Sequence, residues 1–111
     1  MTAREQALKN HKAHDWYYDG WLRPESRPTW NFANPKPNIG YGQTLLLLYK
    51  IRNEKPISRV EINKRLGRRI TSYSEQYRNL SHAGLIDTSS KGTKISKLGI
   101  EYVHEMLSDY I

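Results

Sequence analysis

Side chains that could support catalysis or bind a metal are few in this sequence. His11 and His14 lie three residues apart, a spacing that puts two imidazoles on one face of a helix, and Asp15 follows directly. No Cys, Glu or third His stands close to them, so a packing or surface role is the better interpretation and no metal site is predicted. The sequence shows no carboxylate pair, glycine-rich phosphate loop or Ser/His/Asp set. We therefore expect a protein that is not an enzyme and binds no cofactor.

Cationic side chains are the abundant chemical groups, and they are concentrated in the middle of the chain. The 111 residues include 18 Lys or Arg and 11 Asp or Glu, which gives a formal net charge of +7. Residues 50–97 hold twelve of the bases and four of the acids, whereas residues 98–111 hold three acids and no base. A positive field attracts polyanions such as DNA, RNA or an anionic membrane surface. We expect a polyanion to meet the middle of the chain.

Composition narrows the class of protein further. The longest apolar run, residues 45–48, is far shorter than the roughly 18 residues that a membrane span needs. The first residues lack the basic-then-apolar pattern of a secretory signal. Cysteine is absent, which excludes disulfides and thiol chemistry and fits a reducing compartment. These features predict one cytoplasmic domain without membrane association.

The first 42 residues are predicted to form a helix followed by an irregular connector. Thr2 and Glu5 have the spacing of a capping box, so a helix is expected from residue 2 to about residue 19. Residues 20–42 are rich in proline and glycine. The segment also contains aromatic residues, which disordered linkers normally lack, so we expect it to pack on the domain. Trp21 and Trp30 of this segment, together with Trp16, Tyr17 and Tyr18 before it, could stack on bases or form an effector pocket, but a packed core or interface patch is the commoner use.

Residues 43–111 carry regular signals and are predicted to form a second unit. Residues 43–53 have the pattern of a buried helix that stops before Pro56. Ser58 and Glu61 form a second capping box, which opens a short helix that ends at Gly67.

A third helix and a hairpin are expected next. Ser72 and Glu75 open the helix, and its buried stripe is predicted to hold Tyr73, Tyr77 and Leu80. Gly84 supplies the left-handed cap. Strands are expected at residues 85–88 and 93–96 around a turn at 89–92, and a last helix from about residue 97 to the end.

This order of elements resembles a winged helix-turn-helix, and several motifs support the resemblance. Residues 57–58, 61–62, 66–67, Tyr77, Leu80 and 83–86 are similar to the second and third helices of the MarR and PadR class of transcriptional regulators. Residues 94–99, Lys-Ile-Ser-Lys-Leu-Gly, resemble the end of their wing, where a Ser/Thr-x-x-Gly turn leads into the C-terminal helix. The match covers about residues 43–103. It implies a mostly α fold with a small β-hairpin wing and extra N-terminal and C-terminal helices. Asn63 departs from the family, which usually has a small apolar residue there, so the two helices should pack more loosely or through a hydrogen bond.

The resemblance implies sequence-specific binding of double-stranded DNA, most simply by a transcriptional repressor. Its third helix would then enter the major groove, with Arg78 as the best candidate to donate to O6 and N7 of guanine. Ser72 and the free amides of the first turn would suit a phosphate oxygen. The outward arc of that helix is predicted to hold Thr71, Ser74, Glu75, Arg78 and His82.

Other basic residues are expected to neutralise phosphates, a role that gives affinity without reading sequence. On and after the second helix these residues are Arg59, Lys64, Arg65, Arg68 and Arg69. At the tip of the wing they are Lys91 and Lys94.

The distribution of apolar residues around the last helix predicts a homodimer. Its apolar residues cover more of the circumference than one core-facing stripe requires. We expect the surplus to pack on a second copy through Tyr102, Val103, Met106, Leu107 and Tyr110. Alternatively, the N-terminal segment covers this face within one monomer.

Two further functions remain open for the same fold. One is a DNA-binding role in replication, partition or mobile elements, and the other is a protein–protein adaptor. DNA binding should weaken steeply with salt, whereas an apolar adaptor interface should not. The sequence identifies no small-molecule effector.

Overall fold

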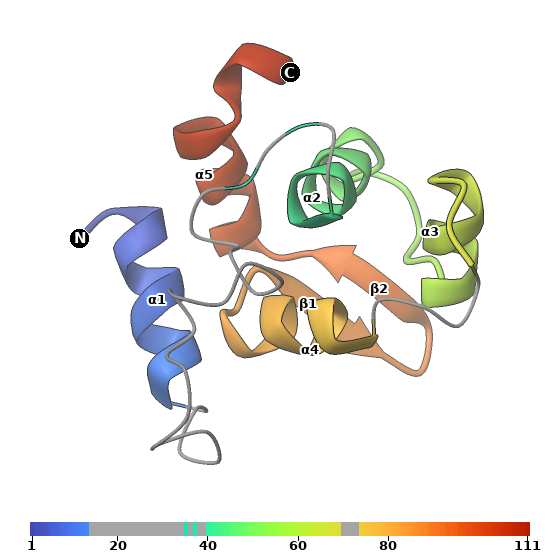
Figure 1. The fold of residues 1–111 in the computed structure, drawn as a ribbon, viewed down its shortest axis with the longest axis horizontal. Helices are drawn as coiled ribbons and strands as arrows, with labels where there is room; N and C mark the ends of the chain where they lie inside the picture. Colours follow the sequence, from blue (N-terminus) through green and yellow to red (C-terminus); the bar gives the residue numbers. More distant parts are fainter. Residues whose placement is uncertain (14–34, 36, 38–39, 70–73) are drawn as a thin grey trace.

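The computed structural model of the chain describes residues 1–13, 35, 37, 40–69 and 74–111 (Figure 1). The elements in this part are, in order, α1 (Ala3–Ala13), α2 (Gly40–Lys50), α3 (Arg59–Arg65), α4 (Ser74–His82), β1 (Ile86–Ser89), β2 (Gly92–Ile95), α5 (Lys97–Met106) and the 3-10 turn η4 (Ser108–Tyr110). The expected mostly helical fold with a small antiparallel hairpin is confirmed. The predicted continuation of the first helix from residue 14 to 19 lies outside the described residues, as does the predicted connector, residues 20–42, apart from residues 35, 37 and 40–42, the last three of which belong to α2.

The N-terminal helix is held at its first turn by two acceptors. The Thr2 hydroxyl oxygen accepts from the Glu5 amide at 3.1 Å, as the capping box predicts. The hydroxyl also donates to the Glu5 carboxylate at 3.2 Å. Glu105 of α5 accepts from the amides of Ala3 and Arg4 at 3.1 and 2.9 Å, which ties α1 to α5. A carboxylate suits a helix N-terminus because the amides there are unpaired and partly positive.

Helix α2 begins at Gly40, three residues earlier than expected. The Gly40 carbonyl accepts from the Thr44 hydroxyl at 3.1 Å and from Nη2 of Arg68 at 2.8 Å, so a distant side chain holds this first turn in place. The predicted start of this helix rested on the spacing of apolar residues, which does not reveal such a long-range contact.

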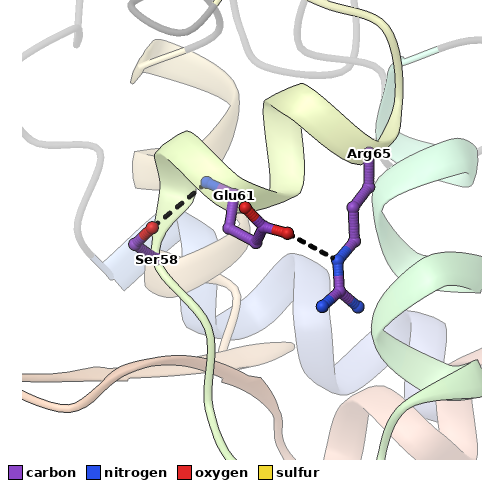
Figure 2. Close-up of polar contacts among 3 residues, drawn as sticks. All are labelled: Ser58, Glu61 and Arg65. Atoms are coloured by element: carbon purple, nitrogen blue, oxygen red, sulfur yellow. Dashed lines mark hydrogen bonds and ion pairs between the residues drawn. The ribbon is translucent and has the colours of Figure 1, made fainter.

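Helix α3 begins as predicted, with half of the expected capping box. The Ser58 hydroxyl oxygen accepts from the Glu61 amide at 3.1 Å (Figure 2). The Glu61 carboxylate accepts from Nε of Arg65 one turn later, at 3.0 Å. Gly67 follows the helix with a φ of 69°, a conformation that glycine adopts at little cost.

The hairpin is anchored to the segment before α3 by a contact that the sequence did not reveal. Strands β1 and β2 pair antiparallel with Ile86 opposite Ile95, within one residue of the expected bounds. Ile57 and Thr93 exchange two backbone hydrogen bonds, of 3.2 and 2.7 Å. A Cβ at Gly92 would lie 2.8 Å from the Ile57 backbone, and Gly92 has a φ of 126°, so glycine is required there.

Helix α5 starts at a cap that explains the Ser-x-x-Gly motif. The Ser96 hydroxyl oxygen accepts from the Gly99 amide at 2.9 Å, and the hydroxyl donates to the Gly84 carbonyl. Gly99 lies directly against the backbone of Leu85. The expectation that this helix runs to the end of the chain is wrong: it ends at Met106, because Leu107 leaves the helical conformation with a φ of −130° and turns into the core.

The hydrophobic core lies between α1, α2, α4, α5 and the hairpin (Figure 1). Tyr102, Val103 and Leu107 belong to this core and are 0, 0 and 1% exposed. Their assignment to a dimer interface is therefore corrected, because other elements of the same chain, α1 and α2 among them, cover α5. Met106 is half-buried and Tyr110 is exposed. Most of the apolar side chains of the last helix therefore pack against other elements of the same chain.

Candidate nucleic-acid interface

Three buried side chains with polar groups, Gln76, Tyr77 and Asn79, lie on the inner face of α4 and fix its rotation. Tyr77 donates to Oδ1 of Asn63 on α3 at 2.6 Å. Gln76 accepts from the Thr44 hydroxyl of α2 at 2.9 Å. Because hydrogen bonds are directional, these contacts set the register of α4 more narrowly than apolar packing would.

Asn79 connects α4 to two further helices. Its Nδ2 donates to the hydroxyl of Tyr41 on α2 at 3.1 Å, and its Oδ1 lies 3.1 Å from Nε2 of His11 on α1. Burial raises the pKa of Tyr41 to about 12, so this phenol is neutral at physiological pH. The expected burial of Tyr77 and Leu80 is confirmed, whereas Gln76 and Asn79 were missed because amides do not appear in an apolar stripe.

The opposite face of α4 is open, as expected from that rotation. Glu75 and Arg78 are exposed, and His82 is half-buried. Together with Ser81 and with Arg59 of α3 they line a surface hollow of about 390 Å³. Thr71, Ser72 and Tyr73 lie outside the described residues, and of Ser74 only the backbone, which opens α4, is described.

Helix α3 contributes three of the predicted cations. The Arg59 guanidinium carbon lies 5.3 Å from the centroid of the Tyr77 ring, which places it at the edge of this hollow. Lys64 is exposed. Arg65 pairs with Glu61 at 3.0 Å with both side chains about 40% exposed, a type of pair worth only about 0–1 kcal/mol. A phosphate could therefore replace that carboxylate at small cost.

Arg68 has a structural role that was not predicted from the sequence. Its Nη1 donates to the Thr44 hydroxyl at 2.9 Å, its Nη2 donates to the Gly40 carbonyl at 2.8 Å, and the side chain is partly buried. Longer contacts of 3.3 and 3.4 Å reach Gln43 and Gln76. Its guanidinium therefore joins α2 to α4, while the assignment of Arg68 to a DNA phosphate stays a prediction. The neighbouring Arg69 is exposed.

The hairpin tip offers one exposed cation. Lys91 is exposed at the turn, where its amide donates to the Ser89 hydroxyl at 3.2 Å. Lys94 is half-buried on β2 and stands opposite Asp87 in the strand register. Opposite charges at such positions attract each other, so Lys94 is the less available of the two.

Asn63 stands where the MarR and PadR class usually has a small apolar residue, and either looser packing or a hydrogen bond was expected there. The structure has the hydrogen bond. Asn63 is 1% exposed and accepts from the Tyr77 hydroxyl. Burial raises the pKa of Tyr77, which keeps its hydroxyl protonated as the donor. This pair joins the two helices of the predicted helix-turn-helix.

His11 is a packing residue, only 3% exposed and within reach of Asn79. His14 and Asp15 lie outside the described residues. In the part of the chain that the structure describes, no three His, Cys, Asp or Glu side chains gather in a way that could hold a metal ion. Within the same residues, none of the helices combines the length and apolar character of a membrane span.

The candidate interface is the α4 face with Glu75 and Arg78 and the adjacent Arg59, and further exposed cations stand on α3, after it and at the hairpin tip. Comparisons of the chain with protein-family models, with curated proteins and with solved structures gave no match.

Proposed function

We propose that this protein binds double-stranded DNA as a winged helix-turn-helix, with α4 as the recognition helix. The single observation that carries the proposal is that the two faces of α4 differ: hydrogen bonds to other helices hold the inner face, and the outer face presents exposed charged side chains. The inner face is hydrogen-bonded to α1, α2 and α3, while Glu75 and Arg78 remain exposed. A rigid helix that presents polar side chains suits the major groove of B-DNA, which is wide enough to admit it.

The two exposed charges of α4 would read different base edges. Arg78 can donate twice to O6 and N7 of guanine. Glu75 lies almost one turn earlier on the same face and carries a carboxylate, which accepts hydrogen bonds, so the N4 amino group of cytosine is its best partner. Both side chains line the same hollow, which supports their acting on neighbouring base pairs.

Phosphate contacts would come from cations around α4. Arg59, Lys64 and Arg69 are exposed on or just after α3, and Lys91 is exposed at the hairpin tip. The bridge between Ile57 and Thr93 supports a fixed position of the hairpin relative to α3, as a wing requires. Contacts of this kind give affinity and salt dependence without base preference.

The simplest biological role for such a binder is transcriptional repression in the cytoplasm, by occupation of its site. Roles in replication, partition or mobile elements would use the same interface. A protein–protein adaptor would not need exposed cations around α4.

Selection of bound sites from random duplex DNA tests this function. The wild-type chain should enrich a defined sequence. Arg78→Ala should lose about 1–3 kcal/mol on the best site and relax the preference at one base position. Lys9→Ala, which removes an exposed cation from α1, is the matched control and should leave the sequence profile intact. If Arg78→Ala weakens all sequences equally, Arg78 contacts only phosphate. If the wild type enriches no sequence, the proposal of sequence-specific binding is wrong.

A further inference from the structure

Helix α2 is apolar on two faces: the side chains of one are fully buried in the core, and those of the other pack against it only in part. Leu45 and Leu48 are 0 and 1% exposed. Leu46 and Leu47 are half-buried and line a second hollow, of about 630 Å³. A helix that is apolar around most of its circumference is normally covered on more than one side. The run of four leucines therefore indicates a contact beyond the core of one monomer.

The second hollow combines an apolar floor with a cationic rim. Tyr110 and Ile111 at the C-terminal end form part of its wall and are 57 and 54% exposed, which is high for large apolar side chains. Among the residues that the structure describes, Lys50 and Arg52 are the charged ones that line it, and none of the acidic side chains does. Figure 1 shows the C-terminal turn at the top of the view and α4 near the bottom, with α2 between their levels and in contact with α4. Of the lining residues that the structure describes, none is shared by the two hollows.

We propose that a second copy of this chain occupies the hollow and forms a symmetric dimer. The chain itself carries the complementary segment: Tyr110 and Ile111 provide exposed apolar surface, and the exposed Asp109 beside them provides the acid that the cationic rim lacks. In a two-fold contact, Tyr110 and Ile111 of each copy cover Leu46 and Leu47 of the other. The same patch is then used twice, as an isologous interface requires.

This surface replaces the one expected from the sequence. Tyr102, Val103 and Leu107 are used in the core, and of the earlier set Tyr110 is the exposed member. The dimer does not depend on DNA, because its surface is separate from the α4 face. It would present two copies of α4, which suits a site with two half-sites.

Sedimentation at micromolar concentration tests the dimer. The wild type should have the mass of two 13.0 kDa chains. Leu47→Glu should raise the dissociation constant at least tenfold, because it removes the apolar contact with Tyr110 and Ile111 and buries a charged carboxylate that must lose its water. Val60→Glu is the matched control, since Val60 is an exposed apolar residue of α3 outside this hollow and is 49% exposed, and this variant should remain dimeric.

Three further variants cover the case in which Leu47→Glu fails to fold, as checked by circular dichroism. Ile111→Glu changes a more exposed side chain and should also give monomers. Lys50→Glu should weaken the dimer, and addition of Asp109→Lys should restore it. A monomeric wild type, or a dimer that survives both Leu47→Glu and Ile111→Glu, would overturn the proposal. Loss of the dimer with retained DNA binding by the monomer would leave the proposed function intact, so the two can fail separately.

Discussion

Replacement of Arg68 by Ala should destabilise the fold, although Arg68 belongs to a run of basic residues that looks like a phosphate-binding surface. The guanidinium makes two short hydrogen bonds, 2.8 Å to the Gly40 carbonyl and 2.9 Å to the Thr44 hydroxyl. Hydrogen bonds that involve a charged group contribute about 1.5–3 kcal/mol. The two bonds share one partly buried side chain and their energies do not add fully, so we expect a loss of about 2–3 kcal/mol in the free energy of unfolding.

Urea unfolding followed by far-ultraviolet circular dichroism measures this loss, and Arg69→Ala is the matched control. Arg69 is exposed, so its replacement should change the free energy of unfolding by no more than about 0.5 kcal/mol. In DNA binding the order should reverse. Arg69→Ala should reduce the salt slope by about one, whereas folded Arg68→Ala should keep the wild-type slope.

Arg68→Lys separates the two roles of the side chain. Lysine keeps the positive charge but lacks the planar fork that reaches two acceptors at once. A structural Arg68 predicts that the lysine variant remains destabilised, while a phosphate-binding Arg68 predicts that lysine restores both stability and affinity. Equal stability of Arg68→Ala and Arg69→Ala would show that the contacts with α2 contribute little.

Two other predictions concern the core. Gly99→Ala should cost several kcal/mol, above the usual range of about 1–3 kcal/mol for overpacking, because its new methyl group would collide with the Leu85 backbone. Gly67→Ala should cost only about 1–2 kcal/mol, since Gly67 has a φ of 69° but open space around it; comparable losses in thermal unfolding would contradict the packing of α5 on Leu85. Above pH 10 the protein should lose stability, because burial raises the pKa of Tyr41 to about 12 and also raises those of Tyr77 and Tyr102. The unfolded state releases these protons first, so the stabilisation is complete below pH 10 and declines above it; for Tyr41 the decline between pH 10 and 12 approaches about 1.4 kcal/mol per pH unit. Urea unfolding at pH 8, 10 and 11 checks this, and a constant free energy would count against buried phenols.

Local sequence signals predicted most of the elements because their causes are local. The caps at Thr2 and Ser58 each need one side chain and an amide three residues later. Gly84 has the predicted left-handed conformation, with a φ of 78°. The Ser-x-x-Gly motif corresponds to the cap at Ser96.

Long-range contacts could not be predicted because their partners are far apart in the chain. Arg68 meets Gly40 across 28 positions, and Asn79 meets His11 across 68. A basic run was therefore assigned entirely to phosphates, although one of its members supports the fold. The apolar residues of the last helix gave the right face, but their spacing alone could not tell a second copy from α1 and α2.

Salt dependence of affinity for double-stranded DNA tests the proposed function most directly. Fluorescence anisotropy with a labelled random duplex would give the dissociation constant between 50 and 200 mM salt. With about four phosphate contacts per bound copy, from Arg59, Lys64, Arg69 and Lys91, the logarithm of affinity should fall with the logarithm of salt concentration with a slope of about −3.6 for each copy. Each of these four residues replaced by Ala should flatten the slope by about one. Absence of binding at 50 mM salt, or a dissociation constant that does not change with salt, would contradict a DNA-binding role for the surface around α4.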